Sequence, residues 1–386
     1  MRVKLLTYHF SDNYGALFQA YALRQWFRRQ GVEAEFINYH PRYVEEGGSF
    51  DQLLNPRQWR KNMTIGYLKA THLYWSVFGN GRQRLAFDDF RRQYLGVGGV
   101  RLMESSQAAG AAEADLLVCG SDQIWNPSVQ KGLDPVYFLD FGVHSRVRRI
   151  SYAPSFGRSE LAPSFHAEAG RLIGRLDAIS VREQSGVDIV RTVTGREAQC
   201  VPDPTILLGD FSELLAARRE ESERHVFCYA LRTAEVIRDV AEHVAKAYGA
   251  RLISPCSARQ RWRAIGTGVE PGPLEWLRLL DSASTVVTNS FHGVALSVIF
   301  NKPFVAVELP GKRGALNERV LNLLTHTGLL ERVVNSADPK KLDSVMTRGI
   351  DWSGVNYQLA QMRAVGVRFL MDQMVMCGGQ SEAARL

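Results

Sequence analysis

Val-Val-Thr-Asn-Ser-Phe-His-Gly-Val-Ala-Leu-Ser-Val-Ile-Phe-Asn-Lys-Pro-Phe, residues Val286 to Phe304, is the stretch that decides the fold. The β-branched run Thr285 to Thr288 predicts a buried strand, Asn289 to Gly293 a tight turn, and Val294 to Phe300 a compact apolar helix. A further strand begins at Val305. Strand, turn, helix and strand together form the repeating unit of a parallel α/β sheet.

His292 falls in the turn of this unit, outside the carboxyl end of a strand and at the start of a helix. Open α/β sheets bind ligands at this edge, and the free backbone N–H groups of a helix start attract anions. We therefore expect a proton donor beside an anion pocket, with Ser290 and Gly293 in the same turn. The alternative is that His292 caps the helix or satisfies a core carbonyl group.

The composition is that of a globular protein of 386 residues, with 45% hydrophobic and 23% charged residues, and this length predicts two domains. The net charge of +7 suggests anionic partners. Five scattered cysteines show no spacing typical of zinc sites or disulfide frameworks. With neither a long apolar run nor a signal-peptide pattern, the sequence favours a cytoplasmic protein without a metal.

Polar residues follow the first predicted strand, where a small turn precedes a helix over residues 17–29. Backbone N–H groups near Gly15 and the side chain of Asn13 are candidates to line a ligand cleft. The alternative is an ordinary helix N-cap made by Ser11 or Asp12.

A second polar turn, Gly120 to Pro127, follows the predicted buried strand at residues 114–119. Within it, Ser121 is a candidate to bind substrate and Asp122 to accept a proton or bind sugar hydroxyls. Trp125 would supply an apolar face to a sugar. The alternative for Asp122 is an Asx turn.

Arg182 directly follows a third predicted strand, so its guanidinium can reach the same sheet edge and hold a carboxylate or phosphate. A salt bridge with Asp177 or Glu183 is the alternative. Lys312 and Arg313 lie in a glycine-flanked basic loop, which is either a second anion contact or a solvated surface loop.

The pattern as a whole predicts two Rossmann-like α/β domains facing each other across a cleft. The N-terminal, acceptor-side domain would span residues 1–212 and the C-terminal domain 213–350, with a last helix in 351–386 packing back on the first domain. An insertion at about 50–95 is rich in basic and aromatic residues, and its segment 57–84 suits either a membrane surface or a helical cap.

Six short motifs follow one another along most of the chain. They are Asp12 to Ala20, Gly120 to Asn126, Ser151 to Gly157, Ser180 to Glu183, Pro202 to Thr205, and Thr288 to Gly293. In this order and at this spacing they resemble the polysaccharide pyruvyl transferase family. The resemblance implies a fold similar to that of the GT-B glycosyltransferases.

The resemblance also implies transfer of the pyruvyl group of phosphoenolpyruvate to two hydroxyls of one sugar, which gives a cyclic ketal and releases phosphate. Phosphoenolpyruvate would be a substrate, and no cofactor is expected. By this likeness His292 is the general acid, Arg182 the anion contact and Asp122 an acceptor binder or base. Some members of the family have an arginine at the position of Ser290, and we expect Lys312, Arg313 or Arg319 to replace it here.

The acceptor implied by the family is a sugar, oligosaccharide or lipid-linked precursor of a capsule or exopolysaccharide, made at the inner face of the membrane. A GT-B glycosyltransferase with a nucleotide-sugar donor is the alternative enzyme, since it shares the implied fold. A non-catalytic protein that binds membrane or anionic glycan is the other class. The absence of a nucleic-acid-binding motif argues against nucleic acid as a partner.

Overall fold

The structure, a computed structural model, describes most of the chain. The described residues are 1–41, 43, 59, 62–63, 66, 81–110, 113–130, 132–142, 147–216, 224–231, 235–256, 265–309 and 314–383. Most of the segment 57–84 and the loop residues Lys312 and Arg313 lie outside the described residues.

The chain divides into two compact units. Unit 1 comprises Met1–Asp12, Phe27–Cys200 and Gln373–Leu386, and unit 2 comprises Asn13–Trp26 and Val201–Asp372. This division differs from the predicted domains, because the boundary lies at residue 200 and the start of the first long helix belongs to unit 2. The start of this helix belongs to unit 2 because Tyr14 contacts Pro271 and Trp276 there.

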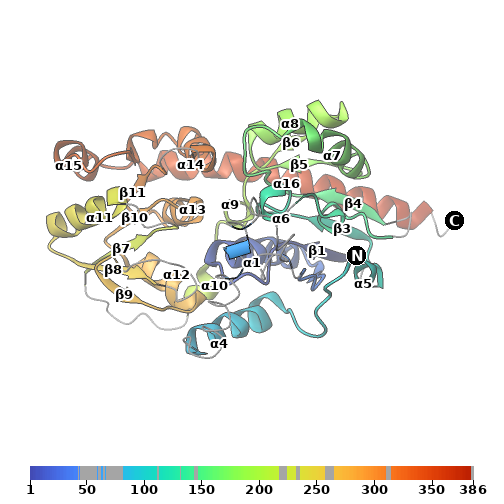
Figure 1. Cartoon of the computed structure of the whole chain (residues 1–386), viewed down its shortest axis with the longest axis horizontal. Helices are drawn as coiled ribbons and strands as arrows, with labels where there is room; N and C mark the ends of the chain where they lie inside the picture. The colour runs from blue at the N-terminus through green and yellow to red at the C-terminus, as the bar shows by residue number, and fades with distance from the viewer. Residues whose placement is uncertain are drawn as a thin grey trace. The chain divides into compact units, whose positions relative to one another are not determined.

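Unit 1 is built on a parallel four-stranded sheet with the order β2-β1-β3-β4 (Figure 1). Its strands are β1 (Arg2–Leu6), β2 (Glu33–Phe36), β3 (Leu116–Cys119) and β4 (Arg148–Ser151). A parallel pair, β5 (Ser180–Val181) and β6 (Gln199–Cys200), lies next to it through a bridge between Ile150 and Ala178. The sequence predicted β1, β3 and β5, as the first strand, the strand at 114–119 and the strand before Arg182, with bounds that differ by a few residues.

The described helices of unit 1 are short and surround an apolar core. They are α4 (Gly81–Phe90), α5 (Ser105–Gly110), α6 (Pro127–Gln130), α7 (His166–Ile173) and α8 (Gln184–Thr194). In the predicted insertion at 50–95, the described end is helical, and Arg91 pairs there with Asp12 at 2.5 Å.

Unit 2 has a parallel six-stranded sheet with the order β12-β11-β10-β7-β8-β9. Its strands are β7 (His225–Tyr229), β8 (Arg251–Pro255), β9 (Thr267–Val269), β10 (Thr285–Thr288), β11 (Phe304–Val307) and β12 (Val333–Val334). The sequence predicted β7, β8, β10 and β11 but missed the two edge strands β9 and β12. Both are short, so their periodicity carries little signal.

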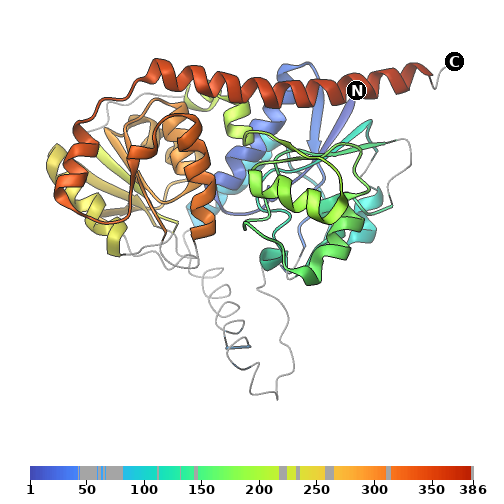
Figure 2. The same cartoon turned by 90° about the horizontal axis from the view of Figure 1, so that it is seen from above.

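Helices cover the sheet of unit 2, and α11 packs across four of its strands. The helices are α1 (Tyr14–Arg29), which begins in unit 2, α9 (Pro204–Leu208), α10 (Ser212–Leu215), α11 (Glu235–Tyr248), α12 (Pro273–Ser282), α13 (Phe291–Ile299), α14 (Gly314–His326) and α15 (Pro339–Thr347). The final helix, α16 (Trp352–Ala383), is one continuous helix (Figure 2). Its last part belongs to unit 1, where Arg148 Nε donates to Gln373 Oε1 at 3.1 Å.

Candidate active site

His292 lies in the first turn of α13, because this helix begins three residues earlier than predicted. The N-cap of α13 is Ser290, whose Oγ accepts a hydrogen bond from the Gly293 backbone N–H at 3.4 Å. Residue 293 has to be a glycine, because a Cβ there would lie 2.3 Å from Thr288 Oγ1. The turn therefore holds His292 close to the carboxyl end of β10.

Residues at three helix starts meet at His292, all of them in unit 2. Gly15, in the first turn of α1, lies so close that an added Cβ would be 2.1 Å from His292 Nδ1. Asp203, the N-cap of α9, places its Oδ2 3.7 Å from His292 Nε2. His292 is only 7% exposed, and its Nε2 has no hydrogen-bond partner among the described residues.

The start of α1 is fixed in unit 2 by Asn13 and Tyr14. Asn13 is the residue that caps α1, since its Oδ1 accepts from Ala16 N–H at 3.2 Å, so neither Ser11 nor Asp12 has this role. Tyr14 donates to the Pro271 carbonyl oxygen at 2.8 Å, and its ring stacks on that of Trp276. These contacts explain why the beginning of this helix belongs to the unit that carries His292.

Tyr229, at the end of β7, lies beneath the turn and hydrogen-bonds with Ser290. Burial raises the pKa of Tyr229 well above its ordinary range, and the hydrogen bond from Ser290 only partly offsets this. At neutral pH Tyr229 is therefore a neutral phenol that supports the turn.

Lys312, Arg313 and Arg319 were the three candidates to replace the arginine that some relatives have at the position of Ser290. Of these, Arg319 lies among the described residues. It lies on α14, is almost completely buried, and its guanidinium carbon is 5.7 Å from the centre of the Phe291 ring. Phe291 directly precedes His292, so a permanent cation lies next to the histidine turn. Lys312 and Arg313 lie outside the described residues, and their roles stay predictions.

A small pocket borders the same turn at the carboxyl ends of β10 and β11. Its lining residues are Thr288, Asn289, Val294, Ala306, Val307, Glu308, Asn317, Val320, Leu321 and Val333. The amides of this lining serve the backbone, since Asn289 Oδ1 accepts from Leu231 N–H at 2.7 Å and Asn317 bonds both polar groups of Leu309. Glu308 is the ionisable residue of this described lining, and its charge does not favour an anion there.

Asp122, in unit 1, has an unusual backbone at the end of β3. Its φ of 71° is in the left-handed region, which costs free energy in a residue with a side chain. The Asp122 carbonyl oxygen accepts from Ser155 N–H at 2.8 Å, which helps to hold that conformation. Its carboxylate accepts no hydrogen bond from any described residue, so the Asx turn that the sequence offered as the alternative is not formed.

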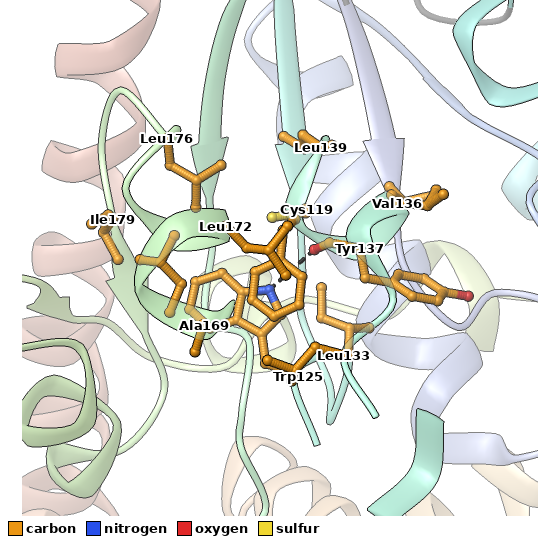
Figure 3. Close-up of a cluster of buried hydrophobic side chains, with 14 of the residues drawn as sticks. Cys119, Trp125, Leu133, Val136, Tyr137, Leu139, Ala169, Leu172, Leu176 and Ile179 are labelled. Carbon is orange, nitrogen blue, oxygen red and sulfur yellow. Dashed lines mark hydrogen bonds between the residues drawn. The ribbon is translucent and has the colours of Figure 1, made fainter. Parts of the chain in front are cut away.

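Trp125 does not present its ring to a ligand, contrary to the prediction. The side chain is completely buried in the core of unit 1, where its Nε1 donates to the Tyr137 carbonyl oxygen at 3.0 Å (Figure 3). Its ring stacks on Phe138.

Ser121 is also completely buried, and its carbonyl oxygen accepts from Thr7 Oγ1 at 2.9 Å. Ser121 and Trp125 both shape unit 1 from inside.

Arg182 is buried in unit 1 and its Nε donates to Glu183 Oε1 at 3.0 Å. The salt bridge that the sequence offered as the alternative is therefore formed with Glu183. A paired guanidinium still has further N–H donors, and the pair fixes its direction.

The predicted residues thus fall into two groups. Unit 2 brings together Asn13, Gly15, Ser290, His292, Gly293 and Arg319, while Ser121, Asp122, Trp125 and Arg182 belong to unit 1. The sequence did not single out Asp203 as a site residue. The signal was the motif Pro202 to Thr205, in which Asp203 precedes a proline at the first position of a helix.

Comparison with known protein families now decides the assignment. The model of the polysaccharide pyruvyl transferase family matches residues 13–309, which is most of the chain and contains the candidate residues of both groups except Arg319. The chain belongs to the polysaccharide pyruvyl transferase family. The comparison with curated proteins found no match.

Solved structures resemble this family member along almost its whole length, at very low identity. UDP-N-acetylglucosamine 2-epimerase from Rickettsia bellii has a TM-score of 0.50 and 8% identity, over 97% of this chain and 96% of that one. The corresponding epimerase from Neisseria meningitidis has a TM-score of 0.48 and 8% identity, over 97% and 100%. A spinosyn rhamnosyltransferase complexed with thymidine diphosphate has a TM-score of 0.43 and 12% identity, over 95% and 96%. The fold is of the GT-B type, with two Rossmann-like units, as the sequence predicted.

Proposed function

We propose that this protein transfers the pyruvyl group of phosphoenolpyruvate to two hydroxyls of one sugar, forming a cyclic ketal and releasing phosphate. The observation that carries the proposal is His292, held at the start of α13 with its Nε2 buried and without a hydrogen-bond partner among the described residues. A nitrogen in this state is suited to proton transfer, and the helix starts around it suit an anionic donor.

The proposed reaction needs one proton transfer to carbon. His292 protonates the methylene carbon of phosphoenolpyruvate, so that the carbon bearing the phosphate becomes an oxocarbenium centre. One sugar hydroxyl adds there, phosphate leaves, and the second hydroxyl adds to close the ring. One hydroxyl proton restores the histidine and the other leaves with phosphate, so atoms and charge balance. General acid catalysis contributes about 10²- to 10⁴-fold to such rates.

Two arginines are proposed to bind the charged groups of the donor. Arg319 would replace the arginine that some relatives have at the position of Ser290, and its place over Phe291 supports this choice. Arg182, directed by Glu183, is proposed from the family resemblance to bind an anionic group. Asp122 is proposed to bind the acceptor or to accept a proton from it, since no described residue donates to its carboxylate.

The proposed acceptor is a sugar of a surface polysaccharide or of its lipid-linked precursor, and the reaction requires no metal or cofactor. Among the described residues, no helix has both the length and the apolar character needed to cross a membrane. Contact with a membrane surface through 57–84 stays a prediction. Equal sedimentation with anionic liposomes of the whole chain and of a variant lacking 57–84 would contradict it.

Donor identity is tested by thermal unfolding in the presence of candidate donors. We expect phosphoenolpyruvate to raise the melting temperature, because a ligand that binds only the folded state stabilises it. Uridine and thymidine diphosphate sugars are the comparison. Stabilisation by a nucleotide sugar with none by phosphoenolpyruvate would contradict the proposal and support a glycosyltransferase.

A further inference from the structure

His292 shares its buried surroundings with a carboxylate. Asp203 is 1% exposed, and its Oδ2 lies 3.7 Å from His292 Nε2. Among the described residues, this is the one carboxylate within 4 Å of the imidazole nitrogens. Burying a carboxylate costs free energy unless it meets hydrogen-bond donors or a cation. We therefore ask what Asp203 does beside the histidine.

The other oxygen of Asp203 is already occupied. Asp203 Oδ1 accepts from the Thr205 backbone N–H at 3.0 Å and from Thr205 Oγ1 at 2.8 Å. These two bonds cap α9 and fix the rotation of the carboxylate, so that Oδ2 faces the imidazole. The cap alone uses one oxygen, and a neutral asparagine would serve it equally well.

We propose that Asp203 is a positioning residue for His292: its Oδ2 faces the Nε2 edge of the ring and, with Gly15 against the Nδ1 edge, fixes the orientation of the imidazole for proton transfer. This rests on the proposed function, in which His292 is the general acid. Nδ1 lies on the side of Gly15, where the missing side chain leaves the space that the nitrogen occupies. The proton passes from the imidazole to the methylene carbon of the donor, and the imidazole is left neutral.

Other ionisable groups around the turn do not supply this negative charge, and Glu308 of the neighbouring pocket has no oxygen within 4 Å of the imidazole nitrogens. Arg319 on α14 is cationic and opposes a second positive charge, and Tyr229 at the end of β7 is a neutral phenol. Asp203 at the start of α9 is therefore the negative charge that faces the imidazole.

The test uses Asp203→Asn, which keeps an oxygen for the α9 cap and removes the charge. We expect kcat for phosphate release to fall about 10²-fold while KM for phosphoenolpyruvate changes less than about threefold. The alkaline limb of the pH–rate profile should move to lower pH, because the imidazolium has lost its counter-charge. Asp343→Asn is the matched control, since Asp343 pairs with the more exposed His243 at 2.9 Å, and we expect it to change neither quantity.

A second measurement does not depend on turnover. Side-chain nuclear magnetic resonance of the imidazoles, with His292 assigned by His292→Ala, should show His292 losing its imidazolium signal at lower pH in Asp203→Asn than in the wild type. Asp203→Ser, which also caps a helix, replaces Asp203→Asn if that variant does not fold. An unchanged His292 signal and an unchanged pH–rate profile would overturn the role of Asp203. A wild type that releases no phosphate would overturn the proposed function, while the resonance signal still decides the pairing.

Discussion

The imidazole of His292 lies with Nδ1 against Gly15 at the start of α1 and with Nε2 3.7 Å from Asp203 Oδ2 at the start of α9. Asp203 and His292 belong to different motifs, and only folding brings the two together. Which of several polar residues meets a histidine depends on rotamers and on the packing of distant helices, so the sequence did not select Asp203.

Gly15→Ala tests whether the imidazole needs the space beside α1. An added Cβ would lie 2.1 Å from His292 Nδ1, so the ring must move. We expect at least about a 10²-fold loss of kcat, the size of effect that follows a misplacement of about 1 Å. Alanine is the better helix former, so the melting temperature should change little. Full activity of a folded Gly15→Ala protein would contradict the placement of His292.

The burial of His9 leads us to expect that the free energy of unfolding of unit 1 depends on pH. Burial lowers the pKa of His9 from its ordinary 6.5 to about 4, because desolvation disfavours the charged ring. Between these values the unfolded chain binds a proton that the folded chain does not. The stabilisation is therefore complete above about pH 6.5 and is lost as the pH falls toward 4.

The measurement for His9 is the free energy of unfolding at pH 7.5 and pH 5 for the wild type and His9→Gln. We expect the wild type to lose about 2 kcal/mol more than the variant over this range. His326→Gln, which changes an exposed histidine, is the control and should behave as the wild type. Equal losses in the wild type and His9→Gln would show that His9 is not buried as a neutral ring.

At the scale of elements, periodicity predicted most of the strands and helices. The bounds of β10 agree with the sequence, because a β-branched run is a strong strand signal. The start of α13 was missed by three residues, since phenylalanine, histidine and glycine are poor indicators of a first helical turn. The cap by Ser290 decides that boundary.

Arg319→Lys tests the role of α14 in donor binding. Lysine keeps the charge but cannot make two parallel hydrogen bonds to a phosphate or carboxylate. We expect KM for phosphoenolpyruvate to rise about 10-fold with a smaller change in kcat. Arg332→Lys is the matched control, because Arg332 is also buried in unit 2 and donates to the Val345 carbonyl oxygen at 2.7 Å. If both variants raise KM equally, the role of Arg319 is general packing.

Trp125→Ala tests whether Trp125, in the loop after β3, is a core residue and not a sugar-binding one. Because the ring is fully buried and stacked on Phe138, its removal leaves a cavity in the core. We expect the free energy of unfolding to fall by about 3–5 kcal/mol. Chemical denaturation measures this directly. A variant of wild-type stability with weakened acceptor binding would restore the predicted sugar-binding role.

At the scale of the whole molecule, the sequence predicted two parallel α/β units but not which segments of the chain belong to each unit. The start of α1 belongs to unit 2 because Tyr14 stacks on Trp276 and Gly15 contacts His292. Contacts between residues so distant in the chain cannot be predicted from any local sequence pattern. Three predictions about the whole molecule therefore stay predictions: the cleft between domains, the basic loop at Lys312, and the membrane contact of 57–84.

The most direct test of the central claim is phosphate release from phosphoenolpyruvate with a panel of pyranosides and lipid-linked saccharides. The wild type is compared with His292→Ala and with the control His243→Ala. We predict release that depends on one class of acceptor, that falls at least about 10²-fold in His292→Ala, and that persists in His243→Ala. Release by His292→Ala at the wild-type rate, or no release with any acceptor, would contradict the account.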